Sequence, residues 1–284
     1  MKLFCFYIVY YIKQIFYLIN RKLLCRKQLW SLALIDANQN IIKQFKYRNK
    51  FWADPFPIKN KDKYFIFFEE MNFSTQKGEI SFIQLNNKFE IENHSIVLKG
   101  ETHFSFPNVF KHNEEFYMLP ENSESNNLIL FKSYNFPFDW RPYKILIQGI
   151  KLLDPIFFYY RGTFWLLANK VNEYEYDNNH SLYLYFSDDL FSNSWSPHPL
   201  NPIVSDSRFS RNAGRIIFKG NKIFRVSQNC FVNYGSKINF MEICEISKID
   251  YSEKLVSHVH PIANSKGIHT YNEIADLAWI DLLY

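Results

Sequence analysis

Glycine, paired cysteines and clusters of basic residues are all scarce in this chain of 284 residues. With only 8 glycines, its turns have to rely on Asn, Asp, Pro and Lys-Asn pairs. None of the four cysteines belongs to a C-x-x-C pair, which argues against a zinc site. We expect free thiols in a reducing compartment rather than a disulfide between Cys230 and Cys244. The formal charge of +5 is spread out, and no Lys/Arg run forms a nucleic-acid track, so we expect no nucleic-acid partner.

Sustained helical periodicity is also missing after residue 28. Aromatic residues make up 19% of the chain, and most of them are Phe and Tyr, which favour the half-buried surface of a pleated sheet. No Gly/Ser linker or low-complexity tract divides residues 29–284. We therefore predict that this range is one all-β domain.

Residues 1–28 have a different character. An apolar run from Leu3 to Ile12 is interrupted by Lys13-Gln14, resumes over Ile15–Ile19, and is followed by Arg21, Lys22, Arg26 and Lys27. The small-residue cleavage site of a secretory signal is absent. We predict a short apolar and basic helix that attaches the protein peripherally to the inner, cytoplasmic face of the membrane. A membrane-spanning helix and a helix packed on the domain itself are the alternatives.

One pattern recurs along the domain. Its first copy starts at Trp52-Ala53-Asp54-Pro55, passes a polar tip at Asn60–Lys63, and continues through an aromatic strand to Glu69-Glu70. Later copies run over 106–121, 154–169, 213–228 and, more weakly, 269–281. The aromatic residues at matching strand positions recur about every 50 residues, which is the range of propeller blades; they are Phe65, Tyr117, Trp165, Phe224 and Trp279.

This period predicts a five-bladed β-propeller in which each blade is an inner hairpin with outer strands. The last copy has only its inner hairpin before Tyr284. The strands Trp30–Ile35 and Asn40–Phe45, left over at the start, would complete that blade and close the ring. A β-sandwich is the alternative, but its strands would not recur with so long a period.

Acidic residues are predicted to gather at one mouth of the central channel. On this alignment Asp54 and Asp154 begin two inner strands, and Glu69-Glu70 and Glu121 end second strands that return to the same mouth. Glycosyl chemistry needs one carboxylate that stays ionised and one carboxyl group that holds a proton. We therefore predict Asp54 as base or nucleophile, Glu121 or Glu70 as acid, and Asp154 as the residue that positions and tunes them.

Other residues at this mouth are expected to bind substrate, and they are Trp52, Glu69, Asn108, Asn169, Arg211, Arg215, Gln228, His269 and Asn272. Trp52, Phe104 and Tyr234 would stack on sugar faces. Arg211 and Arg215 would pair with the phosphate of a sugar nucleotide or with an acidic sugar. We expect neither a metal nor a cofactor. The alternative for each residue is structural, because Asp-Pro and polar strand ends are common in turns.

Several motifs carry a resemblance to a known family. WADPF…YFIFFEE, SFPNVF…FYMLPE, LDPIFF…FWLLAN and GIHTYNE follow one another over residues 30–284. Together they resemble the amino-terminal domain family of plant glucosamine inositolphosphorylceramide transferase and its stand-alone bacterial relatives. That family is similar to the five-bladed propellers of furanosidase-type glycosidases, in which an Asp on the first blade and acids on later blades are catalytic. The resemblance implies a sugar, an oligosaccharide or a sugar nucleotide as ligand.

Three functional hypotheses follow. The first is a carbohydrate-active propeller that acts on glycosidic bonds, by transfer or hydrolysis, in the biosynthesis of surface polysaccharide or glycolipid. The second is a non-catalytic glycan-binding module that docks a partner glycosyltransferase. The third is a protein-interaction propeller without a role in sugar chemistry.

Overall fold

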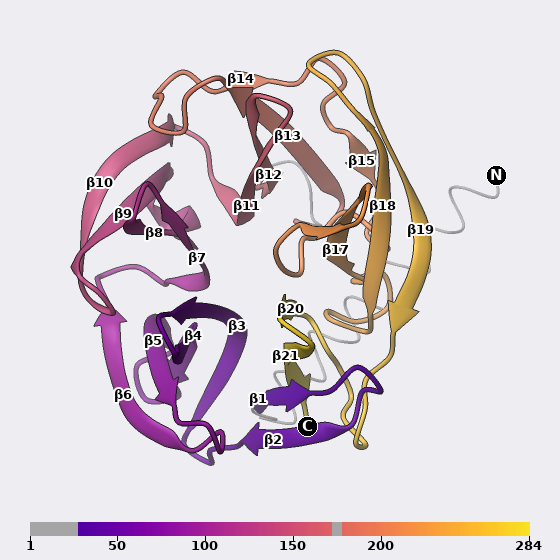
Figure 1. Cartoon of the computed structure of the whole chain (residues 1–284). Coiled ribbons are helices and arrows are strands. Elements are labelled where there is room, and N and C mark those ends of the chain that lie inside the picture. The colour runs from indigo at the N-terminus through magenta and orange to yellow at the C-terminus, as the bar shows by residue number, and fades with distance from the viewer. Residues whose placement is uncertain (1–27, 172–177) are drawn as a thin grey trace.

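Five antiparallel sheets surround a central channel in the computed structural model, which describes residues 28–171 and 178–284 (Figure 1). Blade 1 holds β3 (Lys50–Asn60), β4 (Lys63–Asn72), β5 (Lys77–Leu85) and β6 (Ile91–Leu98). Blade 2 holds β7 (Ser105–His112), β8 (Glu115–Glu121), β9 (Asn127–Asn135) and β10 (Phe138–Gln148), with a 3-10 turn, η1 (Ser123–Ser125), between β8 and β9. Blade 3 holds β11 (Leu152–Tyr160), β12 (Thr163–Lys170), β13 (Ser181–Ser187), β14 (Ser196–Pro197) and β15 (Val204–Ser205). Blade 4 holds β16 (Ile217–Lys219), β17 (Lys222–Gln228), β18 (Ile238–Ile246) and β19 (Tyr251–Val259).

The fifth blade joins the two ends of the described chain. It contains β20 (Tyr271–Ile274) and β21 (Leu277–Leu283) from the end, and β1 (Trp30–Ile35) and β2 (Ile41–Phe45) from the start, in the order β2-β1-β21-β20. β1 pairs with β21 in the antiparallel register Trp30↔Leu283 to Ile35↔Ala278. Indigo and yellow strands accordingly lie side by side in Figure 1. The predicted five-bladed ring and its mode of closure are confirmed.

The blades pack face to face through apolar and aromatic side chains. Trp52, Leu34 and Trp279 lie in one buried cluster between blades 5 and 1, and Phe67, Met118 and Trp140 lie in another between blades 1 and 2. Nearer the channel, Phe56 and Phe106 meet edge to face with ring centroids 4.8 Å apart. This packing explains why the aromatic residues recur once per blade, since each large ring fills the wedge between neighbouring sheets.

A shared kink marks the start of three inner strands. Asp54, Phe106 and Asp154 all have positive φ, at 53°, 47° and 45°, and each precedes a proline. The strand register shifts at each of them, so each is part of a β-bulge. A left-handed conformation costs a non-glycine residue roughly 1–3 kcal/mol, so the surrounding contacts must hold it in place. These contacts belong to the channel mouth.

The two ends of the channel are distinct, and we call them the mouth face and the tip face. The mouth face is where the kinked strands begin and where β4, β8, β12, β17 and β21 end. The tip face carries the inner hairpin turns, such as residues 61–62, 113–114 and 161–162. Connections from one blade to the next run over the mouth face.

No helix among residues 28–171 and 178–284 is long and apolar enough to cross a membrane. The predicted amino-terminal helix falls on residues 1–28, nearly all of which lie outside the described residues. Cys230 is buried and Cys244 is exposed, and neither forms a disulfide.

Candidate functional site

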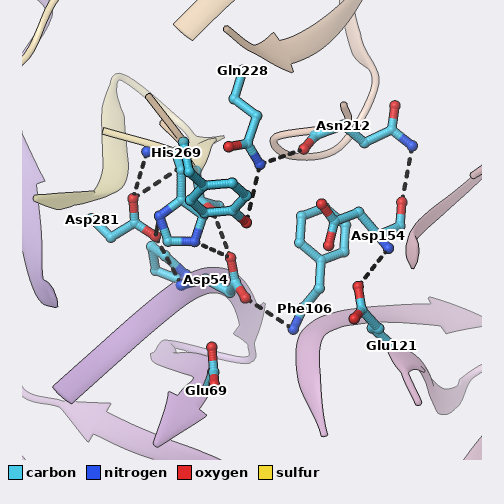
Figure 2. A network of polar contacts seen from close by, with 12 residues as sticks. Asp54, Glu69, Phe106, Glu121, Asp154, Asn212, Gln228, His269 and Asp281 are labelled. Carbon is cyan, nitrogen blue, oxygen red and sulfur yellow. Dashed lines mark hydrogen bonds and ion pairs between the residues drawn. The ribbon is translucent and has the colours of Figure 1, made fainter. Parts of the chain in front are cut away.

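Carboxylates at the mouth join neighbouring blades through the kinked strand starts (Figure 2). The backbone N–H of Asp54 donates to Asp281 Oδ2 of blade 5 at 3.0 Å. The N–H of Phe106 donates to Asp54 Oδ2 at 3.1 Å, and the N–H of Asp154 donates to Glu121 Oε2 at 2.9 Å. Each bulge therefore presents its N–H to an acid of the preceding blade.

Two asparagines complete this ring. Asn212 of blade 4 donates to the Asp154 carbonyl at 2.9 Å. Asn272 of blade 5 accepts the Arg215 N–H at 2.8 Å and donates to the Pro55 carbonyl at 2.8 Å. All five blades are thus tied together by polar contacts at one level of the channel. The Asn272 amide is occupied by its two hydrogen bonds and does not face a ligand.

His269 lies between two buried carboxylates. Its Nε2 is 3.0 Å from Asp54 Oδ1, and its Nδ1 is 3.1 Å from Asp281 Oδ2. Asp281 Oδ1 also accepts the N–H groups of His269 and Thr270, each at 2.9 Å. Burial lowers the pKa of His269, but the charges of Asp281 and Asp54 outweigh it and raise the pKa well above the usual value. The imidazole is therefore a cation at neutral pH.

This imidazolium keeps Asp54 ionised. Burial by itself would raise the pKa of Asp54, but the charge and hydrogen bond of His269 bring it below its usual value. The Thr270 hydroxyl, which donates to Asp54 Oδ1 at 2.7 Å, and the Phe106 N–H add to that effect. Asp54 is only 4% exposed and lies at the mouth as the sequence predicted.

A second cluster joins blades 2, 3 and 4. Arg211 Nε donates to Asp154 Oδ2 at 2.5 Å, and its NH2 group lies 3.4 Å from Glu121 Oε2. Burial raises the pKa of Asp154 well above its usual range, the Arg211 guanidinium opposes that rise, and the carboxyl groups of Glu121 and Asp54 add to it. The two aspartates of the mouth thus differ: His269 favours the ionised form of Asp54, whereas at Asp154 burial and the ion pair with Arg211 act in opposite directions.

Glu69 and Glu70 point to opposite faces of β4, as neighbours in a strand must. Glu69 stays near the mouth, where its Oε1 is 3.1 Å from His103 Nε2, and burial raises its pKa. Glu70 points away from the mouth and is held by residues of its own blade. It accepts hydrogen bonds from Lys50 Nζ at 2.7 Å and Trp52 Nε1 at 3.1 Å, and its Oε2 is 2.7 Å from His94 Nε2.

Glu70 is unsuited to the predicted role of acid. Burial raises its pKa, but the hydrogen bonds of His94 and Lys50 outweigh burial and bring the pKa down to about 2. A carboxylate held so firmly in its ionised form does not carry a proton to give. Its contacts make it a structural anion within blade 1, where it is held by β3 and β6.

We expect Glu70→Gln to lower the free energy of unfolding by about 3 kcal/mol at pH 7, the equivalent of a pKa that falls from 4.5 to about 2. Because the folded-state pKa is depressed, this stabilisation is present above pH 4.5 and lost as the pH falls toward 2. Urea unfolding from pH 7 to pH 3 would show the variant and the wild type converging. Glu79→Gln is the control, since Glu79 pairs with Glu70 across β4 and β5 but forms no ion pair with a described residue. A difference between Glu70→Gln and the wild type that does not change with pH would contradict this account.

Arg215 fills the channel below the mouth. Its guanidinium donates to the carbonyls of Pro57 at 2.9 Å and Val109 at 2.6 Å, and it lies over the Phe56 ring, 5.0 Å from the centroid. The burial of this charge lowers its pKa to about 10. Arg215 therefore bridges blades 1, 2 and 4, and Arg211 is occupied by carboxylates. Neither arginine is placed as the predicted phosphate contact would need it.

The remaining predicted residues are mostly enclosed. Trp52 has no exposed surface and packs against Phe68, so it cannot stack on a sugar. Asn108 and Asn169 are buried on the inner hairpins, and Asn169 donates to the Ser181 carbonyl at 2.9 Å. Gln228 Nε2 lies 3.4 Å from the hydroxyl of Tyr234, within the mouth cluster.

Two mouth residues, Asp281 and His103, escaped the sequence prediction. Asp281 lies two residues before the end of β21, and the fifth copy of the repeat ends on it, so the repeat itself could have identified it. His103 lies in a connection between strands, where no repeat signal reaches. Tyr234, which was predicted to stack on a sugar, lies in another such connection. Tyr234 lies beside His269, with ring centroids 5.3 Å apart.

Asp54, His269 and Asp281 are also close enough together to share a metal ion, since ligand atoms of all three lie within 4.8 Å of one another. Both imidazole nitrogens already face a carboxylate, and Asp281 accepts three backbone N–H groups. The geometry is that of a buried ion triad whose Asp281 is held by backbone N–H groups.

The five-bladed fold of this chain is similar to that of solved glycoside hydrolase structures. Zg3597, a family 117 glycoside hydrolase produced by Zobellia galactanivorans, aligns with a TM-score of 0.60 at 12% identity over 90% of both chains. The catalytic domain of the Coprinopsis cinerea GH62 α-L-arabinofuranosidase aligns with a TM-score of 0.59 at 13% identity over 90% of this chain and 97% of that one. At such identities these likenesses establish the fold.

The chain belongs to the family described as glucosamine inositolphosphorylceramide transferase 1, N-terminal, whose model matches residues 30–277. Glucosamine inositolphosphorylceramide transferase 1 of Arabidopsis thaliana is 32% identical over 229 residues, which are 80% of this chain and 30% of that protein. The protein of the same name from Oryza sativa subsp. japonica is 32% identical over 210 residues, 73% of this chain and 28% of its own length. The chain therefore spans less than a third of the curated relatives that it matches. The family predicted from the sequence motifs is confirmed.

Proposed function

We propose that the protein binds a carbohydrate at the channel mouth and acts there on a glycosidic bond, by transfer or hydrolysis, in the assembly of a glycolipid or surface polysaccharide. The observation that carries the proposal is the meeting of three carboxyl groups at one mouth, each beside a cation: Asp54 lies 3.0 Å from His269, and Asp154 and Glu121 both contact Arg211. His269 lowers the pKa of Asp54, whereas burial raises the pKa of Asp154 against the opposing charge of Arg211. Environments that push two pKa values apart are how an acid and a base are assigned.

In this proposal Asp54 is the base or nucleophile. Its carboxylate is fixed by three donors and has its charge balanced by His269, so it can take up a proton or positive charge without moving. The proton-donor role falls to the pair Glu121 and Asp154 instead of Glu70. The Glu121 side chain is 12% exposed against 5% for Asp154, so Glu121 lies on the solvent side of that pair.

The identity of the relatives supports a carbohydrate context. The curated relatives are named glucosamine inositolphosphorylceramide transferase 1, and the solved structures with this fold are named as a family 117 glycoside hydrolase and a GH62 α-L-arabinofuranosidase. Because the chain covers under a third of those transferases, their activity is carried over only as part of this proposal.

A second candidate function is a glycan-binding module that docks a partner glycosyltransferase. It is favoured by the hydrogen bonds that join the blades, since Asp54, Glu121 and Asp281 all accept backbone N–H groups from kinked strands. These acids hold neighbouring blades together even if no reaction occurs at the mouth.

The test is a thermal-shift screen of the full chain against sugar nucleotides and oligosaccharides, followed by chromatography of each ligand that stabilises the protein. We expect a sugar present at about 100 times its Kd to stabilise the fold by about 2.7 kcal/mol and to be converted on incubation. Ligands that raise the Tm but are recovered unchanged with every acceptor tried would favour the binding module. A screen without any stabilising sugar would contradict both candidates.

A further inference from the structure

The mouth face and the tip face differ in charge. Exposed basic side chains recur around the mouth-face connections of the blades, and examples are Arg48, Lys77, Lys99, Lys151 and Lys266. None of these five forms an ion pair with a residue in the described part of the chain. Acids in the described connections of this face are few, namely Glu101, Glu124 and Asp206, and Asp206 is paired with Arg208. The connection at 172–177, with further acids in its sequence, lies outside the described residues.

The tip face is mixed in sign. Lys61 lies beside Asp62 and Lys88 lies near Glu90 in their turns. Other tip lysines are neutralised by ion pairs: Lys111 with Glu114 at 2.5 Å, Lys219 with Glu273 at 2.9 Å, and Lys248 with Asp188 at 2.8 Å. The excess of unpaired positive charge is thus on the mouth face, around a channel mouth that is itself acidic.

The amino-terminal segment joins the propeller at the same face. β1 starts at Trp30, whose indole lies against the His269 ring at 4.1 Å, and the Leu29 carbonyl accepts the N–H of Tyr284. The residues just before this point are apolar and then basic, with Arg21, Lys22, Arg26 and Lys27 closest to the domain. An apolar and basic sequence is the kind that binds an anionic membrane surface. The amino-terminal segment joins the propeller at the mouth face, and the excess of basic side chains is on the same face. Both observations therefore favour membrane contact at the mouth face.

We propose that the mouth face of the propeller lies against an anionic membrane surface, with the lysine rim on the lipid headgroups and the acidic mouth at its centre. The lysine rim is attracted to anionic lipid electrostatically, as juxtamembrane basic clusters are. The acidic mouth, set inside the rim, is then open to the sugar of a lipid headgroup. That last step rests on the proposed function, whereas the orientation does not.

The first experiment compares two triple variants of the full chain that change the net charge equally. The rim variant is Lys99→Glu/Lys151→Glu/Lys266→Glu, and the tip variant is Lys61→Glu/Lys88→Glu/Arg161→Glu; all six residues are exposed and form no ion pair with a described residue. Binding to vesicles of phosphatidylglycerol and phosphatidylcholine is measured by sedimentation. We expect the rim variant to bind at least about 100-fold more weakly and the tip variant to stay within about threefold of the wild type. Equal losses in the two variants would overturn the proposal, because net charge alone would then explain binding.

The second experiment reads orientation directly. Ser74→Cys and Asn87→Cys place a fluorophore at the mouth end and the tip end of β5, about 30 Å apart along one strand, in a background where Cys5, Cys25 and Cys244 are serine. Lipid-borne quenchers should quench the probe at position 74 and leave the probe at position 87 bright. Stronger quenching at position 87, or equal quenching at both, would overturn the orientation.

A soluble polyanion is the competing partner for a basic rim. Binding of the wild type to a heparin-like polymer with no binding to the vesicles would overturn the membrane proposal in favour of that class. Turnover of soluble sugars without quenching at the mouth would keep the proposed function and overturn this inference alone.

Discussion

Replacing Asp54 with asparagine is expected to reduce turnover by about 10²–10⁴-fold, the range that a positioned acid or base contributes to a reaction. The substitution preserves shape but removes the charge that His269 balances and that the Phe106 N–H and Thr270 hydroxyl stabilise. Some stability is also lost, about 1–3 kcal/mol, because those donors then face a weaker acceptor. Steady-state kinetics and urea unfolding of the same preparation separate the two effects.

Asp281→Asn is the matched control for Asp54→Asn. Both carboxylates flank His269, at 3.1 Å and 3.0 Å, and both accept backbone N–H groups across a blade boundary. Asp281 is completely buried, so its substitution disturbs the same ion triad without altering the carboxylate that is proposed as base or nucleophile. Turnover that falls equally in the two variants, in proportion to lost stability, would remove Asp54 from the chemistry and leave it a purely structural residue.

The propeller could be predicted from the sequence because its signal is repeated. A large aromatic side chain is needed in every wedge between blades, and residues such as Phe65, Tyr117 and Trp165 supply it at a constant spacing. The closure of the ring could be predicted as well, because the last repeat lacked outer strands and the residues just after 28 supplied two strands to complete it. Packing of this kind depends on residue type and spacing, and both are visible in one sequence.

The different positions and roles of the acidic residues could not be predicted from the sequence in the same way. Alternation in a strand requires Glu69 and Glu70 to face opposite sides, but the bulge at Asp54 decides which of them faces the mouth. His103 reaches Glu69 only because its connection folds back onto β5, where the Gly78 N–H donates to His103 Nδ1 at 3.0 Å. A Cβ at Gly78 would lie 2.6 Å from the Phe104 carbonyl oxygen, so glycine is needed for this approach. Such contacts arise from tertiary packing, which residue spacing does not encode.

The partners of the two arginines were hidden for a similar reason. A sequence presents Arg211 and Arg215 as two free cations four residues apart. In the fold Arg211 meets Asp154 from the neighbouring blade, and Arg215 crosses the channel to carbonyls of blades 1 and 2. Both arginines, which the sequence presents as available to a ligand, are therefore bound by other residues of the protein.

Gly214→Ala is expected to destabilise the protein by about 3 kcal/mol or more, because the new methyl group would overlap backbone that cannot rotate away. A Cβ at Gly214 would lie 2.1 Å from the Tyr271 carbonyl oxygen, and the φ of 153° at Gly214 is strained for any L side chain. Gly214 precedes the inner strand of blade 4 and lies beside the start of the inner strand of blade 5, where the Tyr271 N–H donates to the Ala213 carbonyl at 2.8 Å.

Gly220→Ala separates the clash from backbone strain. Gly220 also has a positive φ, 57°, but lies in a tip-face turn with nothing within 4 Å of an added Cβ, so we expect a cost of only about 1 kcal/mol there. Denaturant unfolding of the two variants gives the comparison, and similar losses in both would show that conformational strain, and not contact between blades, is what glycine relieves. A much larger loss of stability at Gly214 would show that the boundary between blades 4 and 5 is a close-packed seam one residue from Arg215. The contact of Asn272 with the Arg215 N–H crosses that seam. The glycine would then be what allows blades 4 and 5 to come close enough for the polar ring at the mouth to close.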